Sequence, residues 1–217
     1  MTSALDSKDT ARLEAFSDGV FAIAITLLVL ELKVPELATS GGLWHALVDE
    51  WPAFAAYLTS FLIIGIMWVN HHSMYRQIVR VDRPQLFLNL FLLLWTALLP
   101  FPTALMARYL DAGTHDAHVA AAVYSANLFL AAVAFSLTWA HAVRHGRLIA
   151  APMDPRAERR SLIRFSGGTV VYALTIGLAF VSAPVTLAVQ FLIAAYYAFE
   201  QVAPTGSRPS RGHNSGP

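Results

Sequence analysis

One uninterrupted apolar run near the start of the chain limits what this sequence can fold into. Residues Val20 to Leu30 carry no charge, and Glu31 and Lys33 close the run. A helix rises about 1.5 Å per residue, so a helix from Arg12 to Lys33 would be roughly 30 Å long, which is the thickness of the hydrocarbon of a bilayer. We therefore expect this segment to be a membrane-spanning helix.

The composition of the whole chain is typical of a membrane protein. Of its 217 residues, 56% are hydrophobic and only 13% are charged, which is about half the charged fraction of a typical soluble domain. The chain has no cysteine, which excludes disulfides, thiolate metal sites and cysteine nucleophiles. The net charge is +1 and no basic stripe interleaved with aromatic residues occurs, so we expect no nucleic-acid partner.

Six hydrophobic segments predict an all-α membrane protein with six transmembrane helices per subunit. The six-span domain is expected over residues 12–202, after a short cytoplasmic N-terminus at residues 1–11. Residues 203–217 are rich in glycine, serine, proline and arginine and predict a disordered cytoplasmic tail. Pro100 and Pro102 should kink or end the third span. The predicted spans cover residues 12–34, 52–70, 85–107, 119–143, 166–181 and 185–199.

The lysines and arginines give these spans an orientation. With both termini in the cytoplasm, every one of these residues except Lys33 and Arg108 lies on the cytoplasmic side. We therefore expect a multi-pass protein of the inner cell membrane with both termini inside. Trp44 and Trp51, in the loop after the first span, suit the membrane–water interface.

Polar side chains at the cytoplasmic ends of the first two spans are candidate functional residues. Arg12, Ser17 and Asp18 precede the apolar run, and His71 and His72 end the second span. Ionisable groups at membrane depth are costly unless they are paired, and they mark function by default. Arg12 and Asp18 are too far apart for a pair within one helix. We expect a buried network with a partner helix; the alternative is that each side chain reaches the headgroups independently.

The pair His71-His72 does not predict a metal site. Adjacent residues on a helix point about 100° apart, and no carboxylate stands at ligand spacing nearby. A hydrogen-bonding role is expected instead, with no metal and no cofactor. The sequence also lacks a glycine-rich phosphate loop, a His-Glu-x-x-His motif and a nucleophile elbow. We therefore expect no enzyme, and an intramembrane enzyme stays as a minor alternative.

An aliphatic stripe follows one face of the first span. Ile23, Leu27 and Leu30 are spaced i, i+4 and i+7, and the neighbouring face has small residues, such as Gly19 and Thr26, that suit close helix packing. If several copies surrounded an axis, the stripe would form rings that narrow it, as in channels with a hydrophobic constriction. The alternative is that the stripe faces lipid or a neighbouring helix.

Two stretches resemble one known family. The motif R-x-x-x-F-S-D-G from Arg12 to Gly19, followed by VFAIAITLLVLEL, resembles the first-helix signature of the bacterial relatives of the lysosomal transmembrane potassium channel. The motif W-x-N-H-H from Trp68 to His72 resembles the second motif of that family. The six-span layout extends the likeness over roughly residues 10–200, although the later spans match only in hydropathy.

The resemblance implies a homotetramer in which four first helices line a cation pore. Ile23 would form the narrowest ring, Leu27 and Leu30 would form further rings, and Thr26 would offer hydroxyls near the constriction. The Thr-Val-Gly-Tyr-Gly filter of ordinary potassium channels is absent from the sequence.

The resemblance also gives the polar cluster a role. Arg12, Asp18 and either His71 or His72 would hold the pore helix to its neighbours, with Ser17 beside Asp18. Which of the two histidines faces Asp18 stays open.

The function expected from these observations is a potassium-permeable channel that is weakly to moderately selective for potassium over sodium. Aliphatic rings give an ion no oxygen ligands, so they should discriminate less than a carbonyl filter does. The expected partners are the lipid bilayer, monovalent cations and further copies of the chain, with K⁺ as the permeant ion. A proton-coupled secondary transporter that uses Asp18 and the histidines is the main alternative, and a membrane scaffold is the other.

Overall fold

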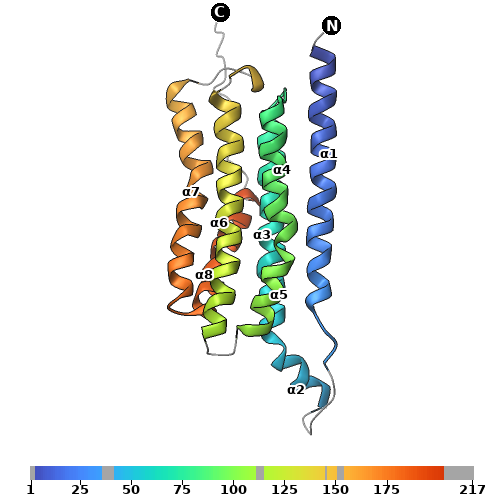
Figure 1. Ribbon diagram of the computed structural model, residues 1–217, viewed down its shortest axis with the longest axis vertical. Helices are drawn as coiled ribbons and strands as arrows, with labels where there is room; N and C mark the ends of the chain where they lie inside the picture. Colours follow the sequence, from blue (N-terminus) through green and yellow to red (C-terminus); the bar gives the residue numbers. More distant parts are fainter. Residues whose placement is uncertain (1–2, 36–41, 111–114, 145, 151–153, 203–217) are drawn as a thin grey trace, which may run out of the picture.

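The computed structural model describes residues 3–35, 42–110, 115–144, 146–150 and 154–202. Within these ranges the regular secondary structure is helical, apart from one isolated β-bridge between Ile78 and Ile149, and short turns and extended segments connect the helices. The long helices run side by side along one axis (Figure 1). The helices are α1 (Ser3–Leu27), η1 (Leu28–Glu31), α2 (Gly42–Asp49), α3 (Trp51–Tyr75), α4 (Arg83–Leu98), α5 (Pro100–Tyr109), α6 (His115–Arg144), η2 (Gly146–Leu148), α7 (Pro155–Ala179) and α8 (Ala183–Val202).

Proline fixes where several helices begin. It lies in the first turn of α3, α4, α5 and α7, where its missing N–H has no helical partner to lose. The prediction that Pro100 and Pro102 interrupt the third span is confirmed. α4 ends at Leu98, and α5 begins at Pro100.

The prediction of six transmembrane helices per subunit is wrong. Among the described residues, four helices are long and apolar enough to cross a membrane, and they cover Asp9–Glu31, Trp51–Tyr75, Arg83–Tyr109 and His115–Arg144. The last two predicted spans correspond to apolar stretches of fewer than 18 residues, Ser166–Ala179 within α7 and Ala183–Ala198 within α8. At 1.5 Å per residue, each of these apolar stretches covers less than about 27 Å, short of the roughly 30 Å of hydrocarbon.

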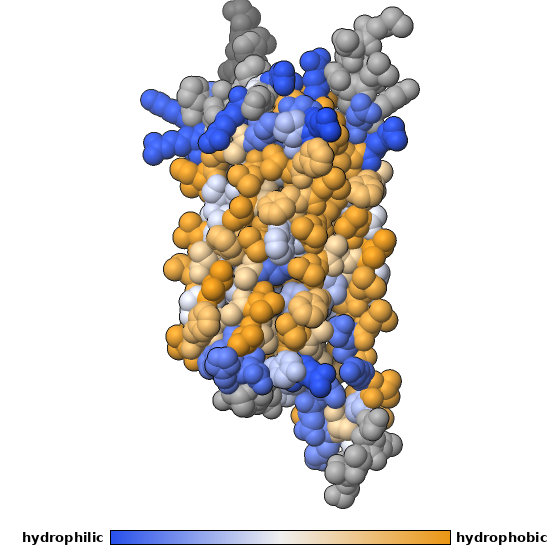
Figure 2. Space-filling view, viewed as in Figure 1, coloured by the Kyte–Doolittle hydropathy of each residue, from blue (hydrophilic) through white to orange (hydrophobic). Residues whose placement is uncertain are grey.

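The first helix extends nearly to the start of the chain. α1 begins at Ser3, so residues 3–11 belong to the same helix as the start of the first span. The tail predicted over residues 203–217 lies outside the described residues. On the face in view, Figure 2 shows a broad orange band across the bundle with blue side chains gathered at its two ends, which is the surface expected of a protein that spans a bilayer.

The subunit core leaves α1 at one edge of the bundle. α6 packs against α4, α5, α7 and α8, and its Tyr124 and Trp139 are fully buried. α1 packs instead on α3 and α4 (Figure 1). One long side of α1 therefore has no partner within the described part of the subunit.

Candidate functional site

α1 has two faces with different surroundings. The side chains of Leu13, Ser17, Phe21, Ala24 and Leu28 are buried against the subunit's own helices. Their spacings of three and four residues place them on one side of the helix. This face holds α1 to its own subunit, so the opposite face is the one left for other partners.

The residues predicted to line a pore lie outside that buried face, Ile23 and Leu27 on α1 and Leu30 on η1. Ile23 is 61% exposed, Leu27 is 41% exposed and Leu30 is 69% exposed. Thr26 lies on the same side of α1 and is also exposed. Its hydroxyl donates to the carbonyl oxygens of Ala22 and Ile23, each at 2.9 Å. Because the hydroxyl proton points back to the backbone of α1, the lone pairs of the Thr26 oxygen point away from the helix.

A buried hydrogen-bonded network ties α1 to α3 and α4. The amide of Asn89 on α4 donates to Ser17 Oγ at 2.9 Å, and the Ser17 hydroxyl donates to the carbonyl oxygen of Leu13 at 2.8 Å. Asn89 Oδ1 accepts from His71 Nε2 at 2.9 Å and from the Tyr75 hydroxyl at 3.2 Å. Ser17, His71 and Asn89 have no exposed surface. Asn89 thus joins three helices at one point.

Asp18 lies outside this buried network. Its Oδ1 accepts a hydrogen bond of 2.9 Å from Trp68 Nε1 on α3. His72 lies on the exposed side of α3, and its Nδ1 is 3.6 Å from Glu14 Oε1. The two adjacent histidines therefore serve different partners, as their 100° separation on a helix requires.

The sequence and the structure agree only in part on this cluster. The structure brings Ser17 and His71 together through Asn89, and it pairs Asp18 with the second span, although with a tryptophan and not with a histidine. Arg12 is exposed and has no hydrogen bond or ion pair to any described residue. The expected Arg12–Asp18–histidine network is therefore not formed within one subunit.

Sequence reasoning overlooked the residue at the centre of the network. Asn89 is the one asparagine of the predicted third span, and three apolar residues flank it on each side. A buried amide in a membrane helix needs a partner on another helix, so this isolated asparagine is the signal that could have found it. The pairing of Glu14 with His72 depends on how α1 is rotated against α3, which the sequence does not specify.

We expect Asp18→Ala to lower the amount of assembled protein more than it changes ion preference. The substitution removes the acceptor of the Trp68 indole, a loss of about 1 kcal/mol for one hydrogen bond inside a membrane protein. Size-exclusion chromatography of detergent extracts measures the assembled fraction, and flux measurements give the permeability ratio. Asp18→Asn keeps an acceptor oxygen and should recover most of the assembled protein. Normal assembly with an altered ion preference would instead mean that Asp18 acts on ions directly.

A second polar cluster lies at the end of the bundle where α1 begins. It joins the turn before α4 to the end of α6 and to η2. Asp82 precedes α4, and its Oδ1 accepts from the backbone N–H of Gln85 at 3.0 Å. His141 Nε2 on α6 donates to the same carboxylate at 3.0 and 3.2 Å, and Arg147 lies 3.5 Å from its Oδ2. Partial burial raises the pKa of Asp82, but the contacts from Gln85, His141 and Arg147 outweigh it and hold the pKa below its usual value.

This lowered pKa predicts a loss of stability in acid. A carboxyl whose pKa is lower in the folded state stabilises the protein above its unfolded pKa, and that stabilisation is lost as the pH falls through the folded value. We therefore expect the melting temperature to drop below a pH of about 4. The variant Asp82→Asn can still cap α4 but has no carboxylate to protonate. Its melting temperature should therefore fall less in acid than that of the unmodified protein. Thermal unfolding of both proteins across the acid range measures the difference, and parallel curves would contradict the prediction.

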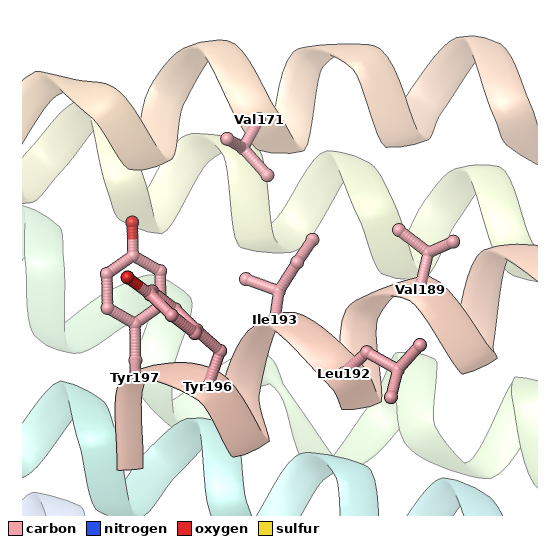
Figure 3. Close-up of a pocket in the computed structure, with 6 residues that line it drawn as sticks. All are labelled: Val171, Val189, Leu192, Ile193, Tyr196 and Tyr197. Carbon is pink, nitrogen blue, oxygen red and sulfur yellow. The ribbon is translucent and has the colours of Figure 1, made fainter. Parts of the chain in front are cut away.

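The described residues contain no site for a metal ion. No three histidine, aspartate or glutamate side chains among them lie close enough to share one. A groove of about 330 Å³ lies between α7 and α8 (Figure 3). It has no charged group in its lining, which is formed by Val171, Val189, Leu192, Ile193, Tyr196 and Tyr197.

The chain is similar to known proteins over most of its length. Residues 12–100 match the family described as endosomal/lysosomal potassium channel TMEM175. A potassium channel from Streptomyces collinus is 54% identical over 194 residues, which cover 89% of this chain and 94% of that protein. A potassium channel from Chamaesiphon minutus is 42% identical over 207 residues, which cover 94% of this chain and all 100% of that protein.

A solved structure shares the fold. The crystal structure of a lysosomal potassium-selective channel TMEM175 homolog from Chamaesiphon minutus matches with a TM-score of 0.79 at 38% identity. The match covers 90% of this chain and 100% of that chain. The resemblance inferred from the two sequence motifs is therefore confirmed at the level of the family. This chain belongs to the family of the endosomal/lysosomal potassium channel TMEM175.

Proposed function

We propose that this chain is one subunit of a homotetrameric cation channel that passes K⁺ through a pore lined by four α1 helices. The family is one of channels, by the names of its members, so the predictions of a channel and of no enzymatic activity are confirmed. The assembly, the pore-lining residues and the degree of selectivity are the proposal.

The observation that carries this proposal is the unequal burial of α1. One face is buried in the subunit, and the opposite face presents Ile23, Leu27 and Leu30. A helix at the edge of a bundle can bring such a face to a common axis with symmetry-related copies, because closed rotational symmetry repeats the same surface around that axis. Four copies would then form stacked rings, with Ile23 as the narrowest.

The polar network supports this arrangement mechanically. Asn89 fixes α1 against α3 and α4 through Ser17, and interhelical hydrogen bonds of this kind are typical links between membrane helices. A pore helix that is held on one face keeps the opposite face at a constant distance from the axis. The width of the Ile23 ring would then depend on side-chain size and not on movement of the helix.

The chemistry of the rings sets the expected selectivity. Isoleucine and leucine offer no oxygen to replace the water around an ion, so a cation must pass hydrated or only partly dehydrated. Potassium holds its water less tightly than sodium does, so a tight apolar ring should favour potassium modestly. The hydroxyl of Thr26, one turn away from Ile23, would supply the nearest side-chain oxygen. Weak to moderate preference for potassium follows.

The basic residues support an orientation in the membrane. The start of α1, the turn between α3 and α4 and the segment after α6 lie at one end of the bundle (Figure 1). Arginines concentrate there: Arg12, Arg76, Arg80, Arg83, Arg144 and Arg147. By the positive-inside rule this end faces the cytoplasm. We place the protein in the inner membrane with both termini inside.

A flux assay on purified, reconstituted protein tests the proposed function. Liposomes that contain the protein should release K⁺ faster than Na⁺ under matched gradients, and planar bilayers should show unitary current steps. Flux without steps would favour a proton-coupled transporter, because the turnover of a transporter is too slow to produce them. No flux of any ion would favour a membrane scaffold. Either result would contradict the channel.

A further inference from the structure

Two segments far apart in the sequence are joined at the end of the bundle where α1 begins. The turn at residues 76–83, between α3 and α4, meets residues 146–150, after α6, through the isolated β-bridge between Ile78 and Ile149. The backbone N–H groups of Val79 and Arg80 donate to the carbonyl oxygen of Leu148, at 2.9 and 3.3 Å. Both isoleucines are buried. Backbone hydrogen bonds and apolar packing therefore hold the side chains around this joint in place.

The joint carries a large positive charge. Residues 76–83 and 144–150 contain one carboxylate, that of Asp82. This carboxylate already accepts hydrogen bonds from the backbone N–H of Gln85 and from His141, so little of its charge is left to repel an anion. Arg147 approaches it from the second segment, at 3.5 Å, so the arginines of both segments meet around Asp82. These arginines are all exposed, and they are Arg76, Arg80, Arg83, Arg144 and Arg147.

An apolar stripe on α4 leads from this charge into the membrane span. Phe87, Leu90 and Leu94 follow Arg83 at i+4, i+7 and i+11, which places all four on one side of the helix. Phe87 is 60% exposed, Leu90 is 47% exposed and Leu94 is 55% exposed. The guanidinium of Arg83 lies over the ring of Phe87, 6.0 Å from its centroid, at the limit of a cation–π contact. A cation thus stands at the end of an exposed apolar track.

A phospholipid presents the complementary groups in the same order. Its phosphate lies at the membrane surface and its acyl chains lie in the hydrocarbon below. Arginine binds phosphate through paired N–H donors, and basic clusters next to a membrane helix attract anionic lipids. On the face in view, Figure 2 shows blue side chains directly beyond the orange band at this end of the bundle, which is the depth of the headgroups. A soluble anion would contact the arginines and leave the stripe uncovered.

We propose that Arg83, with Arg80 and Arg147 beside it, binds the phosphate of an anionic phospholipid whose acyl chain lies along the stripe of Phe87, Leu90 and Leu94. Arg83 is the first residue of α4, so the lipid would hold the start of this helix and stabilise the folded chain. The inference requires only that the chain spans a membrane. It does not depend on the proposed tetramer or on the residues that line its pore.

Thermal unfolding in an uncharged detergent tests the lipid site. Phosphatidylglycerol is added to one sample, and phosphatidylcholine with the same acyl chains is added to another. A ligand that binds only the folded state raises the melting temperature, so near saturation phosphatidylglycerol should raise it by about 5 °C more than phosphatidylcholine does. Equal shifts from the two lipids would overturn the proposal, because the arginines would then recognise no charge.

Arg108→Gln is the matched control for Arg83→Gln. Arg108 is also exposed, and its guanidinium lies 5.7 Å from the ring centroid of Tyr109, but it belongs to α5, at the opposite end of the bundle. Both variants therefore remove one positive charge and one ring contact. Arg83→Gln should lose about half or more of the shift that phosphatidylglycerol causes, whereas Arg108→Gln should keep it. Equal losses in the two variants would show that the lipid does not bind at this joint.

Two further measurements keep the outcome decisive. Glycerol 3-phosphate has the phosphate without an acyl chain, and a shift as large as that from phosphatidylglycerol would identify a site for soluble anions instead. If Arg83→Gln unfolds too early for comparison, intact-protein mass spectrometry from detergent counts the lipids that remain bound. The unmodified protein and Arg108→Gln should then retain more phosphatidylglycerol than Arg83→Gln, and equal retention by all three would overturn the proposal.

Discussion

A channel that carries Ile23→Asn is expected to pass sodium almost as readily as potassium. A ring of four asparagine side chains would be polar and would leave a wider opening than a ring of four isoleucine side chains. Water would therefore enter the ring, and a hydrated sodium ion could pass without losing water. A barrier lowered by about 1.4 kcal/mol would raise sodium permeability roughly tenfold. Reversal potentials under paired potassium and sodium gradients measure the change in the permeability ratio.

The conservative variant Ile23→Val is the control for this experiment. Valine keeps the ring apolar and removes one methyl group from each side chain, so conduction should rise while the preference for potassium is largely retained. Ile23 is exposed in the subunit, and neither change opens a cavity in the subunit core. Permeability ratios that stay unchanged in Ile23→Asn would remove Ile23 from the constriction.

Replacing Asn89 by alanine is expected to cause the largest loss of stability. The side chain makes three interhelical hydrogen bonds, to Ser17, His71 and Tyr75, and it is completely buried. Such bonds contribute roughly 0.6–1.7 kcal/mol each in a membrane protein. The loss should therefore be about 2–4 kcal/mol, because the buried donors of His71 and Tyr75 are also left without an acceptor. Unfolding in mixed detergent micelles measures it.

Thr96→Val is the matched control on the same helix. Thr96 is also fully buried on α4, but its hydroxyl donates to the carbonyl oxygen of Leu92 in its own helix, at 3.1 Å. Valine has nearly the same shape, and the loss of an intrahelical bond should cost less than about 1 kcal/mol. If Thr96→Val and Asn89→Ala destabilised the protein equally, the network would have no special role in holding α1.

Local patterns in the sequence were sufficient for the first half of the chain. The segment from Arg12 to Lys33 predicts the first span because a helix of that length matches the thickness of a bilayer and its centre is uncharged. The prolines predict the break between α4 and α5. The spacing of Ile23, Leu27 and Leu30 predicts a common face, because positions on a helix follow from its period alone.

For the end of the chain, the hydropathy pattern led to a wrong prediction of two further membrane spans. The segments at 166–181 and 185–199 are apolar, but the apolar helical stretches there, Ser166–Ala179 and Ala183–Ala198, have fewer than 18 residues. Hydropathy shows that a segment avoids water, whereas it does not show whether lipid or neighbouring protein supplies the apolar surroundings. α7 packs closely on α6, and α8 packs on α3, so protein supplies part of them.

The sequence by itself determined that this chain is helical, that it lies in a membrane, to which family it belongs and which side chains share the aliphatic face of its first helix. Only the tertiary structure decided that this face points away from the subunit, that Asn89 joins Ser17 to His71, and that Asp18 pairs with Trp68. The reason is physical: a sequence period fixes the angles between side chains on one helix, but the rotation of that helix against its neighbours depends on packing between residues far apart in the chain.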